Sequence, residues 1–161
     1  MNRYQIRAIC IEDYMQVTNI YNSNRSFLQN HLGIELIDKD FIHKEVLEMQ
    51  SVGFNSDVIV DTNMQKLLGV LDYRNGEEVY LSLFMLTNDL QGKGFGREIY
   101  SFFEEQMKQC GSKTIRIDVV NDYTDNVIPF WRKMGFLECE TVILEWGNKR
   151  SQAIVMRKTI V

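Results

Sequence analysis

The sequence predicts an α+β domain with a mixed, mostly antiparallel central sheet of about seven strands, flanked by about four helices. Three observations support this fold class. Asn75-Gly76 separates two apolar runs, which is a strong signal for a hairpin of consecutive antiparallel strands. The second run, residues 79–86, leads through a glycine-rich loop into an amphipathic helix. Another apolar run, residues 114–120, follows that helix and is therefore expected to lie parallel to residues 79–86.

The first half of the chain shows alternation, then helical spacing, then short apolar runs. Residues 3–9 alternate as in a half-buried strand, and Glu12-Asp13 suit the positive end of a helix that continues to Asn24. Residues 25–38 have no clean period. The expected elements are a strand over 3–9, helices over 12–24 and from Asp38 or Asp40 to Gln50, and strands over 57–61 and 66–74.

The second half contains two helices and the last four strands. Asn126 is suited to cap a short helix with Pro129 in its first turn, and Gly135 to end it in a left-handed conformation with Phe136 folding back. The expected elements are strands over 79–86, 114–120, 137–146 and 151–160, a helix over 96–110, the short helix before Gly135, and a turn at Gly147-Asn148.

Length and composition indicate one globular domain over residues 1–161. Hydrophobic residues make up 45% of the chain and charged residues 25%, which is ordinary for a folded protein. The net charge of −4 disfavours a nucleic-acid partner and mildly favours cationic small molecules or basic peptides. No targeting or membrane-spanning pattern is present, so we expect a cytoplasmic protein without a membrane partner.

Cysteine and histidine usage bears on redox state and metals. Cys10, Cys110 and Cys139 are odd in number and form no C-x-x-C motif, which predicts free, buried thiols in a reducing compartment. His31 and His43 are the only histidines, so no metal site is expected.

The glycine-rich loop is the strongest candidate for a ligand site. Gly92, Gly94 and Gly96 leave main-chain N–H groups uncovered at the beginning of a helix, where the macrodipole adds positive charge. Lys93 and Arg97 add side-chain charge. This combination favours an anion with several phosphate oxygens.

Two common phosphate motifs do not fit this spacing. A P-loop requires a Gly-Lys-Ser/Thr ending that is absent. A dinucleotide fingerprint requires its third glycine one residue later, and Asp118, at about the distance of a ribose ligand, lies within an apolar run rather than at its end. A Rossmann-type dinucleotide enzyme is therefore a weaker alternative, and the Asn75-Gly76 hairpin also disfavours its parallel sheet.

Gln91-x-x-Gly94-x-Gly96 resembles the pyrophosphate-binding signature of the GNAT superfamily of acyl-CoA-dependent N-acyltransferases. The block from Asn126 to Phe136 resembles a second signature of that family, and the order of strands and helices matches over essentially the whole chain. The resemblance implies a GNAT fold with a parallel, splayed strand pair at the cofactor site, and acetyl-CoA as co-substrate. The residues that it implies for cofactor binding are Phe84, Met85, Leu86, Gln91, Gly92, Lys93, Gly94, Phe95, Gly96, Arg97, Asn126, Phe130, Trp131 and Lys133.

The implied reaction is acetyl transfer from acetyl-CoA to a primary amine of a small molecule or peptide, by direct attack in a ternary complex. A thioester is already activated, so the enzyme must deprotonate the ammonium, position the amine, and stabilise the oxyanion and the departing thiolate. The acceptor stays open, and a homodimer is plausible from the resemblance.

The resemblance leaves the acid and the base open. Tyr80 lies where some members have a basic glutamate, but tyrosine is a poor base near neutral pH and packing is its stronger interpretation. Glu78 is suited to act through water, or is simply solvated. Trp131 replaces a common acidic tyrosine and Tyr123 is the substitute candidate. The alternative hypothesis is an acyl-CoA-binding sensor or degenerate homologue without turnover.

Overall fold

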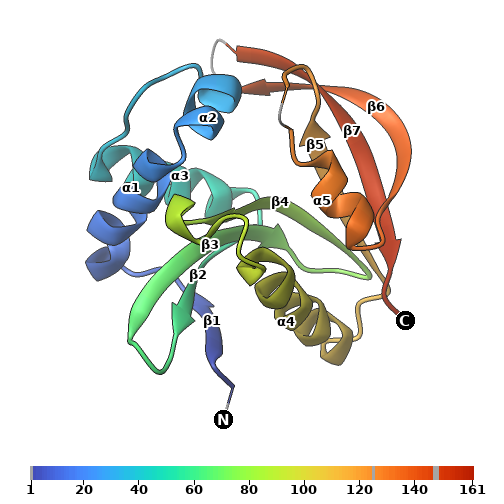
Figure 1. Cartoon of the computed structure of the whole chain (residues 1–161), viewed down its shortest axis with the longest axis horizontal. Helices are drawn as coiled ribbons and strands as arrows, with labels where there is room; N and C mark the ends of the chain where they lie inside the picture. The colour runs from blue at the N-terminus through green and yellow to red at the C-terminus, as the bar shows by residue number, and fades with distance from the viewer. Residues whose placement is uncertain (1, 125, 147–148) are drawn as a thin grey trace.

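The computed structural model describes residues 2–124, 126–146 and 149–161, whose strands form one seven-stranded sheet (Figure 1). The spatial order is β1-β2-β3-β4-β5-β7-β6, and β4–β5 is the parallel pair among antiparallel neighbours. The strands are β1 (Tyr4–Ala8), β2 (Asn55–Asp61), β3 (Lys66–Arg74), β4 (Glu78–Leu86), β5 (Thr114–Val120), β6 (Leu137–Trp146) and β7 (Lys149–Thr159). The expected turn at Gly147-Asn148 lies outside the described residues.

The helices are α1 (Tyr14–Ser23), α2 (Arg25–Phe27), α3 (Lys39–Ser51), α4 (Phe95–Gln109) and α5 (Ile128–Lys133). Four of them correspond to the expected helices. The fifth, α2, is a single turn that runs into a π-helical turn, Leu28–Leu32, in the segment without a clean hydrophobic period. Within the described part of the chain, no helix is long and apolar enough to cross a membrane.

The helices cover the two faces of the sheet in two groups (Figure 1). On one face, α4 and α5 bury Ile99, Phe103 and Trp131 against the sheet. On the other face, α1 and α3 pack Val17 and Ile42 against β2 and β3. The mixed sheet confirms the α+β prediction and excludes the doubly wound parallel sheet that a Rossmann enzyme requires.

The prediction of buried thiols was wrong, because Cys10, Cys110 and Cys139 are all exposed. Cys110 directly follows the last turn of α4, where Gly111 with a φ of +88° turns the chain away. Cys139 lies on β6, at the edge of the sheet. Helical or strand period alone does not bury a side chain at the end of a helix or on an edge strand.

Candidate active site

A β-bulge opens the sheet at the end of the parallel pair. β4 pairs with β5 only from Glu78 to Leu81, while the remainder of β5 continues along β7. At this point Asp72 of β3 lies opposite Leu83 and Tyr73 lies opposite Leu81, so Ser82 has no counterpart. The extra residue bends the strand and reverses its alternation. The end of β4 therefore diverges from β5, which gives the splayed pair expected from the sequence.

The glycine loop follows directly on this free end of β4. Gly92 and Gly94 have φ values of +73° and +87°, which L side chains rarely adopt, and a Cβ at either position would meet open space. Gly94 occupies the N-cap position of α4. No acceptor among the described residues takes a hydrogen bond from the N–H groups of residues 92–97. Six main-chain donors at the beginning of a 15-residue helix are therefore without a partner among the described residues.

The charge and shape of the loop fit the diphosphate of CoA. Lys93 and Arg97 are exposed, and neither forms an ion pair with another described residue. Gly96 lies where a Cβ would be 3.4 Å from the Phe130 ring, so its lack of a side chain lets α4 approach α5. The uncovered N–H groups would hold the diphosphate, and the two cations would add to its binding.

The second block folds as the sequence indicates. The N-cap residue of α5 is Val127, one position after the expected Asn126. The Asn126 side chain accepts a hydrogen bond from the Ile128 N–H at 3.1 Å, and Pro129 lies in the first turn of α5. Gly135 has a φ of +97°, and the Phe136 N–H donates to the Trp131 carbonyl at 3.1 Å. These contacts fix α5 beside the beginning of α4. Lys133 is exposed on this helix.

Trp131 lies in the aromatic core between α4, α5 and β4. It is only 6% exposed. Its ring centroid lies 5.9 Å from that of Phe84, 5.3 Å from Tyr100 and 5.2 Å from Phe136. Little of the indole surface is left for a ligand, so packing is the role that the structure shows for this residue.

Asn24 is a buried residue that the sequence analysis did not single out. Its amide Nδ2 donates to the Leu86 carbonyl at 2.9 Å, and its Oδ1 accepts a hydrogen bond from the Gln91 amide at 2.6 Å. The neighbouring Ser23 hydroxyl accepts from the Asn88 N–H at 3.0 Å. The Gln91 side chain is thus engaged with α1 rather than with the loop mouth. In sequence, Asn24 looks like an ordinary residue at a helix end.

Tyr80 belongs to a polar network just before the point where β4 and β5 diverge. Its hydroxyl donates to Asp118 at 2.9 Å, and Arg116 donates to both carboxylate oxygens of Asp118. Burial and then the charge of Asp118 raise the pKa of Tyr80 well above its ordinary value. Tyr80 therefore stays protonated at neutral pH and is a hydrogen-bond donor, not a base.

The two other catalytic candidates lie in different surroundings. Glu78 forms an ion pair with Arg157 at 3.0 Å, at the end of β4 away from the splay. The Tyr123 hydroxyl, beyond the end of β5, lies 3.3 Å from Nε2 of His31 in the π-helical turn. Burial raises the pKa of Tyr123 and lowers the pKa of His31 to about 4. Of the three candidates, Glu78 is held in an ion pair, Tyr80 donates to Asp118, and Tyr123 contacts His31.

Comparisons with known proteins agree with this geometry. Residues 28–159 match the family model of the acetyltransferase (GNAT) domain. Among curated proteins, none matches this sequence. Several solved structures of proteins named as acetyltransferases have the same fold at low identity.

Three of these structures illustrate the likeness. Spermidine N-acetyltransferase from Vibrio cholerae, with CoA and spermine, has a TM-score of 0.73 at 16% identity, covering 98% of this chain and 95% of its own. Ribosomal-protein-S5-alanine acetyltransferase from Vibrio fischeri has a TM-score of 0.69 at 18% identity, and the match covers 99% of this chain and 94% of that protein. The yncA protein of Salmonella typhimurium, with its cofactor acetyl-CoA, has a TM-score of 0.66 at 17% identity, and the match covers 99% of this chain and 95% of that protein.

The likeness to solved structures is a likeness of fold, and the family model adds a sequence match over most of the chain. Acetyl-CoA is the co-substrate of this family, and the uncovered loop at the beginning of α4 fits it. The chain belongs to the GNAT family of acetyltransferases.

Proposed function

We propose that this protein transfers the acetyl group of acetyl-CoA to a primary amine by direct attack in a ternary complex. The observation that carries the proposal is the pairing of two features: six uncovered N–H groups at residues 92–97, and the free end of β4 that precedes them. The first binds a diphosphate. The second leaves one edge of a strand available to the amides of an extended pantetheine arm.

The donor brings an activated thioester, so the protein needs no nucleophile of its own. The three cysteines are exposed, on elements other than β4 and the glycine loop, which agrees with direct attack. The tasks that fall to the chain are orientation, exclusion of water and proton transfer. Main-chain groups near Met85 and Leu86 orient the reacting end, and the network of Tyr80 with Asp118 holds the base of the splay rigid.

We assign the proton donor for the departing thiolate to Tyr123. Its neighbour His31 has a pKa lowered to about 4, so the imidazole is neutral at physiological pH. It forms a hydrogen bond with the tyrosine and carries no charge that would repel an incoming ammonium. The incoming ammonium loses its proton to solvent, since Tyr80 is already a donor to Asp118. The Tyr123→Phe variant removes the hydroxyl group that would supply the proton, and we expect a lower kcat with an unchanged KM for acetyl-CoA.

Two structural neighbours, a spermidine acetyltransferase and an alanine acetyltransferase of a ribosomal protein, support an amine as the acceptor. The net charge of −4 also favours a cationic acceptor. The second candidate function is an acyl-CoA-binding sensor without turnover. The burial of Trp131 and the engaged hydroxyl of Tyr80 favour it, because they leave few groups for acid–base chemistry.

Release of free CoA thiol from acetyl-CoA separates these functions. The assay compares diamines, aminoglycosides, amino acids and short peptides against a reaction without amine, and mass spectrometry identifies the acetylated product. We expect amine-dependent release with kinetics of a ternary complex. Saturable CoA binding without release for any amine would establish the sensor instead, and absence of CoA binding would overturn both.

A further inference from the structure

The segment from Asn24 to Leu32, which we call the strap, passes from the end of β4 to the loop after β5. It contains the single turn α2 and the π-helical turn that follows. At its start it forms hydrogen bonds with the end of β4, and near its end it contacts the loop after β5. These two strands diverge at the proposed donor site, so the strap joins both sides of that opening.

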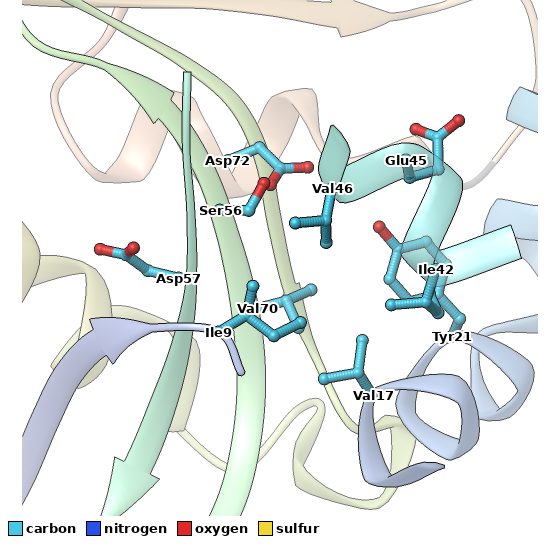
Figure 2. A pocket seen from close by; sticks show the side chains of 10 residues that line it. All are labelled: Ile9, Val17, Tyr21, Ile42, Glu45, Val46, Ser56, Asp57, Val70 and Asp72. Atoms are coloured by element: carbon cyan, nitrogen blue, oxygen red, sulfur yellow. The ribbon is translucent and has the colours of Figure 1, made fainter. Parts of the chain in front are cut away.

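The strap begins on a firmly packed helix. The side chains of Val17 and Tyr21 of α1 lie together with Ile42 of α3 and Val70 of β3 (Figure 2). All four side chains are buried, and the cavity left between these elements is about 20 Å³, the space of one water molecule. Helix α1 is therefore a fixed base, and a change in the order of the strap starts after it.

Two adjacent residues tie the start of the strap to the donor side. The Asn24 side chain, 8% exposed, donates to the Leu86 carbonyl at 2.9 Å and accepts from the Gln91 amide at 2.6 Å. The Ser23 hydroxyl accepts from the Asn88 N–H at 3.0 Å. All three partners precede the uncovered N–H groups of the glycine loop by a few residues. A diphosphate held on those groups would therefore also fix the groups that tie the strap.

The other end of the strap contacts the proposed proton donor. Nε2 of His31 lies 3.3 Å from the Tyr123 hydroxyl. Within the strap only Asn24 and Leu28 are buried, so Leu28 is its one fully buried apolar side chain between the two ties. A segment with few buried contacts opens locally at a low cost in free energy. The order of the strap therefore depends on the contacts at its two ends.

We propose that acetyl-CoA orders the strap through Asn24, and that the ordered strap holds Tyr123 in place through His31. Asn24 and His31 are then positioning residues, because each acts through another side chain rather than on the reacting atoms. The coupling rests on the proposed function for the identity of the cofactor and for the role of Tyr123. Because coupling between two sites is reciprocal, a strap that has lost its ties also weakens the binding of CoA.

Amide hydrogen exchange of the intact chain, measured by mass spectrometry with and without saturating CoA, tests the coupling. We expect CoA to slow exchange in the glycine loop, which it contacts, and in residues 25–32 by at least ~threefold. Helix α3 is the internal control, because it follows the strap in sequence but forms no hydrogen bond or ion pair with the glycine loop, and its exchange should not change. Protection of the loop without protection of the strap would overturn the coupling and leave the proposed function standing. Absence of CoA binding would overturn both.

Asn24→Ala and Gln91→Ala are the test variants, and Asn22→Ala is the control. Gln91→Ala removes only the side-chain contact with Asn24, from an exposed residue, so this variant should fold even if Asn24→Ala does not. Asn22, on the same helix, contacts the main chain of Ile37 instead. At equal occupancy with CoA, we expect protection of the loop but not of the strap in both test variants, and protection of both in the control. Protection of the strap in the test variants would show that CoA orders it by another route and would contradict the proposal.

Double-mutant kinetics give a second readout, at the other end of the strap. His31→Ala removes the contact with Tyr123 and should lower kcat at saturating acetyl-CoA by at least ~threefold, whereas His31→Gln keeps a hydrogen-bonding group and should retain most of it. If His31 acts through Tyr123, then His31→Ala should have no further effect on kcat in the Tyr123→Phe background. Multiplicative effects of the two changes, or an unchanged kcat in His31→Ala, would contradict the positioning role.

Discussion

The amide nitrogen of Asn24 lies 2.9 Å from the carbonyl oxygen of Leu86, which joins the end of α1 to the end of β4 across 62 residues of sequence. The same side chain also accepts a hydrogen bond from Gln91, so one buried amide holds both parts of the proposed donor site. A second bond from Asn24 to the Ile20 carbonyl, at 2.8 Å, anchors it on α1. Because α1 leads into α2, this contact links the segment before α3 to the cofactor loop.

Asn24→Ala should impair acetyl-CoA binding. The change removes four hydrogen bonds and leaves the buried Leu86 carbonyl without its side-chain partner, which should lower the free energy of unfolding by ~2–4 kcal/mol. We expect the KM for acetyl-CoA to rise more than fivefold, because the loop loses its support. Steady-state kinetics and urea unfolding measure the two effects.

Asn22→Ala is the matched control for that variant. Asn22 lies on the same helix and forms two hydrogen bonds with the main chain of Ile37, away from the loop. It should lose stability by a similar mechanism while keeping its KM for acetyl-CoA. Equal changes of KM in both variants would mean that the effect of Asn24 is only one of stability.

Gly94→Val should abolish CoA binding. Gly94 has a φ of +87° and open space around its Cβ position, so valine would be opposed by backbone strain rather than by a clash. Such strain is typically ~1–3 kcal/mol, and relief of it would turn the N–H groups away from the diphosphate. Gly111, at the other end of α4, has a φ of +88° and equally open surroundings. Gly111→Val should cost similar stability and leave CoA affinity, measured by calorimetry, unchanged; a matching loss of affinity there would refute the loop assignment.

Trp131→Tyr and Trp131→Phe should have the same kcat. The indole is packed among aromatic rings and only 6% exposed, so both changes remove buried area and should destabilise the protein by ~1–3 kcal/mol. The two variants differ only in a hydroxyl group. If that hydroxyl protonated the thiolate, the tyrosine variant would gain on the order of tenfold or more in kcat over the phenylalanine variant. We expect less than a threefold difference.

Stability should fall as the pH is lowered from about 6.5 toward 4, in part because of His31. Burial lowers its pKa from 6.5 to about 4 in the folded protein, so the unfolded chain binds more protons between these values. The contribution is fully present above pH 6.5 and is lost as the pH falls. Urea unfolding at pH 7.5 and 4.5 should show a loss that is ~2 kcal/mol smaller in His31→Gln than in the wild type. Identical losses in the two proteins would contradict the shifted pKa.

The sequence alone determined the local structures of the donor site. The glycine loop, the turn at Asn126 before α5 and the stop at Gly135 depend on residues within one or two turns of each other, so their backbone conformations follow from local chemistry. The same holds for the antiparallel pairing of β3 and β4 around Asn75-Gly76. These local signals, in the right order, also predicted the fold class.

Tertiary structure decided which side chains meet. The bulge at Ser82 adds one residue to β4, which reverses the faces of all residues after it and separates the strand from β5. Hydrophobic pattern does not reveal such a shift in advance, because both faces of this sheet are covered by helices. The contacts of Asn24 with Leu86 and of Tyr80 with Asp118 join residues 62 and 38 positions apart, and the exposure of the cysteines depends on where elements end. Such contacts follow from register and packing, which are properties of the whole sheet rather than of any single stretch of sequence.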